Sequence, residues 1–150
     1  MKFQETDVTL LLAESLKTAN WEILSVNNPY AGKSVWIKPT NGYRGKGAII
    51  PDIIARKEKF YLFIESYSGF KKTDIVKLLK LDQPEYYNAI LNLFNEKEIE
   101  LLKALAYPGS RRDYQYPSDI IIFLLNPHKK FVTWINKDNK KKAAIEELFK

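Results

Sequence analysis

The spacing of hydrophobic residues predicts a helix near the start of this chain and two strands after it. Apolar side chains between residues 6 and 19 recur at the interval that places them on one face of a helix. Residues 21–26 and 34–39 are instead rich in β-branched and aromatic side chains, and turn sequences with Asn, Pro and Gly bracket them. We therefore expect one helix and two strands in this part of the chain.

Two further strands, residues 49–56 and 60–67, flank a short charged centre and predict a hairpin. If Glu58 and Lys59 are its two turn residues, the positions of facing residues sum to 117. A longer turn would change this register. With the short turn, the start of the first strand faces the end of the second.

The remainder of the chain alternates between helical spacing and strand-like apolar runs. We expect helices at residues 71–81, 84–106 and 140–150 and strands at residues 119–125 and 130–136. The order is then one helix, four strands, two helices, two strands and one helix. It predicts an α/β fold, with a mixed central β-sheet flanked by helices, in a single domain over residues 1–150.

The composition restricts any metal site to oxygen ligands. There is no Cys in the chain, which excludes disulfides, thiolate zinc sites and a Cys nucleophile. His128 is the only His, so a multi-histidine metal cage is excluded as well. A metal would therefore be held by carboxylates, which favour hard ions such as Mg²⁺ or Mn²⁺.

The net charge is +6, and it is unevenly distributed, with −1 on residues 51–100 and +5 on residues 101–150. This distribution is typical of a polyanion-binding surface around an acidic site, and equally of a Lys-rich surface that serves solubility. The longest apolar run, residues 120–125, is far shorter than the roughly 20 residues that span a bilayer. The N-terminus lacks the apolar stretch of a signal peptide. We expect a cytoplasmic protein without membrane contact.

Two acids mark the open end of the predicted hairpin. Asp52 directly follows Pro51 at the start of one strand, and Glu65 ends the apolar run of the other. The two-residue turn makes these acids cross-strand neighbours, with Cβ atoms about 4.5–5.5 Å apart. Opposed carboxylates repel each other unless a cation lies between them, so the pair predicts a metal site.

This hairpin resembles that of the PD-(D/E)XK nuclease superfamily, which includes many type II restriction endonucleases and Holliday-junction resolvases. The likeness rests on the Pro51-Asp52 pair that begins a strand, on the length of the hairpin, and on Glu65 at the end of an aromatic-aliphatic strand. In that superfamily a helix precedes a mixed sheet whose central hairpin carries the acids, and a helix and another strand follow. The resemblance covers roughly residues 5–125 and implies a restriction endonuclease-like fold.

The resemblance implies a Mg²⁺-dependent (or Mn²⁺-dependent) endodeoxyribonuclease of the restriction type. Asp52 and Glu65 correspond to the metal-binding acids of the superfamily, and the backbone carbonyl of Ser66 corresponds to a third oxygen ligand. The implied reaction is metal-assisted hydrolysis of a phosphodiester without a covalent enzyme intermediate. Cleavage of both strands by so small a chain requires two sites, so the expected partners are double-stranded DNA and a second copy in a homodimer.

The Lys of the superfamily motif is replaced here by Tyr67. A phenol has a pKa near 10 and carries no positive charge with which to orient water. Some members supply the Lys from the following helix, which makes Lys72, and after it Lys71, the candidates for this role. Both lysines are also compatible with solvated positions at the start of a helix. Glu14 resembles an extra acid that some members add from the first helix, or is an ordinary exposed Glu.

Two loops carry residue types that contact nucleic acids. Residues 40–47 and 107–118 combine Gly or Pro with cationic, aromatic and amide side chains. The DNA-contact candidates are Tyr43, Arg44, Lys46, Arg111, Arg112 and Gln115. Surface loops without a ligand have a similar composition.

Other functions remain open. Replacement of the motif Lys is compatible with a catalytically inactive nucleic-acid-binding subunit of the same fold, and a Holliday-junction or repair nuclease would share the same site. The remaining class is a protein-interaction domain, in which Tyr86, Tyr87 and Phe94 would form an interface instead of core.

Overall fold

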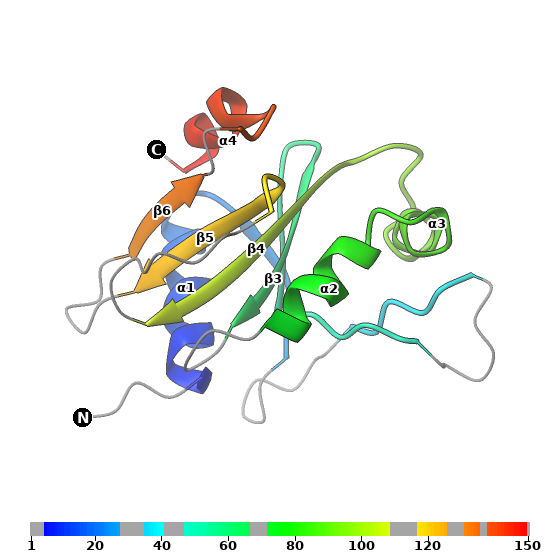
Figure 1. The fold of residues 1–150 in the computed structure, drawn as a ribbon, viewed down its shortest axis with the longest axis horizontal. Coiled ribbons are helices and arrows are strands. Elements are labelled where there is room, and N and C mark those ends of the chain that lie inside the picture. Colours follow the sequence, from blue (N-terminus) through cyan, green and yellow to red (C-terminus); the bar gives the residue numbers. More distant parts are fainter. Residues whose placement is uncertain are drawn as a thin grey trace.

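A computed structural model of the protein describes residues 5–27, 35–40, 47–66, 72–108, 117–125, 131–135 and 138–149. In these residues a mixed β-sheet lies between helices (Figure 1). The helices are α1 (Glu5–Thr18), α2 (Lys72–Lys80), α3 (Pro84–Leu93) and α4 (Lys142–Leu148). The strands are β1 (Glu22–Val26), β2 (Ile53–Lys57), β3 (Phe60–Ser66), β4 (Glu100–Pro108), β5 (Ile120–Leu125) and β6 (Phe131–Ile135).

In the described part of the chain, the sheet contains six strands in the order β1-β2-β3-β4-β5-β6. β1, β2 and β3 form an antiparallel meander, β4 and β5 run parallel to β3, and β6 returns antiparallel to β5. The crossover between the parallel strands β3 and β4 contains α2 and α3. β3 is consequently covered on both faces, and all seven of its residues are buried.

The two faces of the sheet bury separate cores. On one face, α1 and α4 cover a core that includes Leu12 and Ile145. On the other face, α2, α3 and residues 35–40 cover a core that includes Leu78 and Ile90. Figure 1 shows α1 behind the sheet and α2 in front of it. No helix of the described residues is long and apolar enough to span a membrane. The predicted α/β class, a mixed sheet flanked by helices, is confirmed.

The register of the predicted central hairpin is also confirmed. Lys57 pairs with Phe60, and the ladder continues to Ile53 opposite Ile64, so that each pair sums to 117. The first turn residue, Glu58, has a φ of 56°, a conformation that Gly adopts at lower cost than Glu. The short turn is nevertheless kept, because both strands bury their side chains in the cores on either face.

The predicted helix over residues 84–106 is wrong in its second half. α3 ends at Leu93, Asn95 adopts a left-handed φ of 54°, and the amide of Glu96 donates to the carbonyl of Leu91. β4 follows and occupies the centre of the sheet. The helix propensity of this stretch is overridden because a central strand buries Leu and Ala on both faces and pairs with a neighbour on each side.

Two of the other predicted strands also differ. Residues 35–40 stay outside the sheet and form one isolated bridge, between Ile37 and Ile49. β2 begins only at Ile53, so residues 49–52 of the predicted strand precede it. The meander closes without these residues because β1 pairs directly with β2. The order observed in the described residues is one helix, three strands, two helices, three strands and one helix.

Candidate active site

Asp52 lies immediately before β2, and its hydrogen bonds hold it against the end of β3. The backbone N–H of Asp52 donates to the carbonyl of Ile64 at 3.0 Å. The Oδ2 atom of its carboxylate accepts the backbone N–H of Ser66 at 2.8 Å. These two partners flank Glu65 in the sequence, so Asp52 lies beside the end of β3, just beyond the regular ladder, which ends at Ile53. The backbone thus places the two acids at neighbouring positions.

Glu65 lies inside the molecule, with 8% of its surface exposed. Side chains alternate along a strand, so Glu65 shares its face of β3 with Phe63, and on β4 it is paired with Leu105. Both of these neighbours belong to the core beneath α2 and α3. A carboxylate buried at the margin of an apolar core requires polar partners or a cation, which distinguishes Glu65 from an ordinary surface acid.

Thr9 of α1 extends the polar contacts of Asp52 into the interior. The Ser66 hydroxyl lies 3.4 Å from Asp52 Oδ2 and is also hydrogen-bonded to the Thr9 hydroxyl. Because a carboxylate only accepts, Ser66 donates to Asp52 and Thr9 donates to Ser66. Thr9 and Ser66 are both buried. The Asp52 carboxylate is therefore oriented by a backbone donor and by a chain of two hydroxyl groups.

The part played by Thr9 is not evident from the hairpin motif, which concerns only the carbonyl of Ser66. A signal was present, since Thr9 lies at helical spacing with Ala13 and Leu16 and so puts a hydroxyl on the buried face of α1. A buried hydroxyl needs an internal partner. The partner of the Thr9 hydroxyl depends on which strand α1 covers, and the helical spacing of apolar residues does not predict that strand.

The donors at this site fit a hard divalent cation. Asp52 and Glu65 offer carboxylate oxygens and Ser66 offers a backbone carbonyl, all of which suit Mg²⁺ or Mn²⁺. Within the part of the chain that the structure describes, no three acidic or His side chains come together as a metal-binding group. Two carboxylates are sufficient for Mg²⁺, which commonly keeps several waters and takes further oxygens from a substrate phosphate.

The remaining predicted site residues are placed only in part. Lys72 is the first residue of α2, which begins near the end of β3 (Figure 1). Glu14 is exposed on α1 and pairs with Lys17 of the same helix at 3.6 Å. The other candidates lie outside the described residues: Tyr67, Lys71, Tyr43, Arg44, Lys46, Arg111, Arg112 and Gln115.

The aromatic residues at and after α3 pack into the core. Tyr86 is buried, and its hydroxyl donates to the carbonyl of Gly47 at 2.7 Å. Phe94 packs against Tyr61 with ring centroids 5.2 Å apart. Tyr87 is half-buried against the same core. The sequence feature that favours a protein-interaction domain is therefore accounted for by packing.

Comparisons with known proteins do not assign the chain to a family. No model of a protein family matches it, and neither does any curated protein or solved structure. Its function must therefore be inferred from the site itself.

Proposed function

We propose that this protein is a Mg²⁺-dependent endodeoxyribonuclease of the restriction type, with a restriction endonuclease-like fold, acting as a homodimer on double-stranded DNA. The observation that carries the proposal is the pair of hydrogen bonds that join Asp52 to Ile64 and Ser66, the residues on either side of Glu65. A divalent cation bound between two carboxylates at neighbouring positions, one of them almost buried, would stabilise both charges. A catalytic metal site gives this arrangement a function.

The order of elements supports the same proposal. α1 precedes an antiparallel meander, Asp52 and Glu65 lie at one end of its central hairpin, and helices and the parallel strand β4 follow. This is the order of the superfamily that the hairpin resembles. β4 contributes to the agreement, because it supplies the further strand directly beside β3.

Asp52, Glu65 and the carbonyl of Ser66 would hold the metal ion. When bound, Mg²⁺ supplies Lewis-acid chemistry, since it activates water and neutralises charge on a phosphate. The chain itself contributes orientation, because Ser66 and Thr9 restrain the Asp52 carboxylate through the hydrogen bonds described above. Lys72 is the candidate for the motif cation, since α2 begins near the end of β3.

Cleavage of supercoiled plasmid with and without Mg²⁺ tests the proposal. The parent protein should cut only with the metal, and Asp52→Asn should lower the rate on the order of 100-fold or more. Asn keeps an oxygen acceptor for the Ser66 amide, so this variant removes charge while the local hydrogen bond remains. Glu58→Gln, at the opposite end of the same hairpin, is the matched control and should cut at the parental rate. Equal rates for Asp52→Asn and the parent would exclude Asp52 from the catalytic site.

A catalytically inactive DNA-binding subunit of the same fold is the second candidate, because Tyr67 replaces the motif Lys. Such a protein would bind duplex DNA in EDTA and leave plasmid intact at every Mg²⁺ concentration. An active parent whose cleavage is lost in Lys72→Met would decide in favour of the nuclease. A four-way junction offered beside the plasmid distinguishes a junction-resolving repair nuclease from one of the restriction type.

A further inference from the structure

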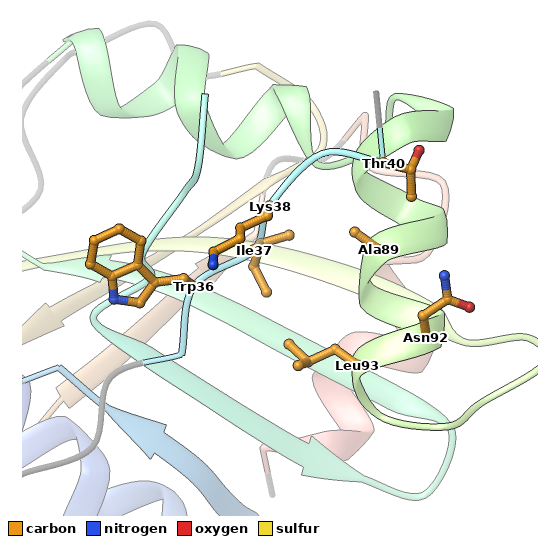
Figure 2. Close-up of a pocket in the computed structure, with 7 residues that line it drawn as sticks. All are labelled: Trp36, Ile37, Lys38, Thr40, Ala89, Asn92 and Leu93. Atoms are coloured by element: carbon orange, nitrogen blue, oxygen red, sulfur yellow. The ribbon is translucent and has the colours of Figure 1, made fainter. Parts of the chain in front are cut away.

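A groove lies between residues 36–40 and α3, on the face of the sheet that carries Glu65 (Figure 2). It is shallow and open to solvent, with a volume of about 780 Å³, and it is lined by residues that include Trp36, Lys38, Thr40, Ala89, Asn92 and Leu93. Trp36 and Leu93 are large apolar side chains, yet they are 51% and 49% exposed. Exposed apolar side chains beside polar groups in a concave surface indicate a binding site.

Backbone hydrogen bonds fix the walls of this groove. Ile37 and Ile49 exchange both of their backbone hydrogen bonds, at 2.7 and 2.9 Å. The amide of Thr40 donates to the carbonyl of Glu85 at 3.0 Å, which ties the segment to the first turn of α3. The groove therefore exists before a ligand binds, and little ordering of the chain opposes binding.

The groove combines three kinds of group that bind a nucleotide. Successive side chains of an extended segment point to opposite sides, so Ile37 enters the core while Trp36 and Lys38 share the outer side. Figure 2 shows these two residues on the segment and Asn92 on α3, farther from them than Leu93. An indole offers a face on which a base can stack, an ammonium contacts phosphate, and an amide pairs with the edge of a base.

A second copy of the chain fits this groove less well than a nucleic acid does. A symmetric dimer would bring the groove against itself, and therefore bring one Lys38 towards the other. Among the described residues that line the groove there is no Asp or Glu, so neither ammonium would meet a carboxylate there. A polyanion would instead be attracted to the groove, both by Lys38 and by the chain's net charge of +6.

We propose that the groove binds an unpaired nucleotide of single-stranded DNA, with its base against Trp36 and Leu93 and its phosphate at Lys38. The inference rests on the proposed function and narrows the substrate of that site to DNA with a single-stranded stretch near the scissile bond. A short stretch of backbone joins the groove to the acidic site. Ile49, which is bridged to the groove segment, precedes Asp52 by three residues, a span of at most about 11 Å.

Binding of a short labelled oligo(dT) in EDTA tests the groove independently of cleavage. Measured by fluorescence anisotropy, Trp36→Ala should weaken binding about tenfold, the loss expected for one stacked base. Trp36→Phe should weaken it less, because an aromatic face remains. Val76→Ala truncates an equally exposed apolar side chain on α2 and should bind like the parent. Stacking should also quench the emission of Trp36, and Trp36→Phe should lose this part of the quenching, while Trp21 and Trp134 remain in both proteins.

An unchanged affinity of Trp36→Ala for oligo(dT) would overturn the inference. So would a dimer whose mass depends on concentration and is lost in Trp36→Ala while oligo(dT) affinity stays the same, since the groove would then be a contact between copies. Failure of the proposed function gives a different result, because oligo(dT) binding in EDTA does not involve the metal. A protein that binds oligo(dT) through Trp36 but never cuts DNA would keep the groove and lose the nuclease.

Discussion

At the scale of single residues, the end of β3 concentrates polar groups inside an apolar sheet. Ser66 is fully buried and offers both its amide and its hydroxyl to Asp52, while Thr9 supports the hydroxyl from α1. These donors stabilise one carboxylate. Glu65, at the same end of the hairpin, adds a second negative charge, which a cation bound between the two acids would neutralise.

We expect Mg²⁺ to raise the melting temperature of the parent protein, because an ion that binds only the folded state stabilises it by mass action. Glu65→Gln should lose most of this shift, and in EDTA it should be as stable as the parent or slightly more so, since the repulsion with Asp52 is removed and the shape is kept. Thermal melts in EDTA and in millimolar Mg²⁺ measure both effects. The opposite result is a parent whose melting temperature does not respond to Mg²⁺ and a Glu65→Gln variant that is less stable in both buffers. It would make Glu65 the partner of a buried cation.

At the scale of elements, a buried cation holds β4 to the segments around it. Only 4% of the Lys103 side chain is exposed, and its ammonium is paired with Asp82 and, at 3.8 Å, with Asp119. Asp82 lies in the turn between α2 and α3, and Asp119 directly precedes β5. One side chain therefore ties β4 both to the helical crossover and to the next strand.

We expect the replacement of Lys103 to be tolerated better than the removal of its partners. Lys103→Met fills a similar volume and leaves two carboxylates that are at least half exposed and can be hydrated, so the free energy of unfolding should change by less than about 1 kcal/mol. The double variant Asp82→Asn, Asp119→Asn removes both of the carboxylates paired with the buried ammonium and should lose about 3–5 kcal/mol. Urea unfolding followed by circular dichroism compares the two. A greater loss in Lys103→Met would contradict this account of the ion pairs.

At the scale of the whole molecule, the α2 face buries Glu65 and carries cations at its surface. Lys77 and Lys80 of α2 line a hollow of about 330 Å³ together with residues 47–50, the segment that leads into Asp52. Lys38 lines the groove and is next to Ile37, which is bridged to Ile49 of that segment. This arrangement is that expected of a surface that follows a phosphate backbone around an acidic site.

Binding of duplex DNA in EDTA should therefore weaken steeply with salt. If four phosphates are neutralised, the slope of log Kobs against log salt concentration should be about −3.6. Lys80→Gln should make this slope shallower by about 0.9, the value for one phosphate contact. Lys17→Gln, on the opposite face of the sheet, should leave the slope unchanged. Anisotropy titrations at several salt concentrations measure these slopes, and an affinity independent of salt would point to a ligand other than nucleic acid.

The sequence by itself determined the helix before the sheet, the register of the central hairpin and the position of Asp52 beside the end of β3. These features depend on contacts between residues close along the chain. A two-residue turn sets the register of both strands, and a shift by one residue would move every side chain of a strand to the wrong face. The buried run of β5 was equally evident, because a continuous apolar segment of that length is typical of a strand covered on both sides.

Only the tertiary structure decided that β4 is a strand, that Thr9 supports the site and that Trp36 lines a groove. β4 has the composition of a helix, and it is extended because β3 and β5 offer it a ladder on each side while helices bury both of its faces. Thr9 is near Ser66 only because α1 packs across the end of β3, far away in the sequence. Such contacts join segments whose separation leaves no trace in local spacing, and they are formed only when the whole sheet and its two helical layers assemble.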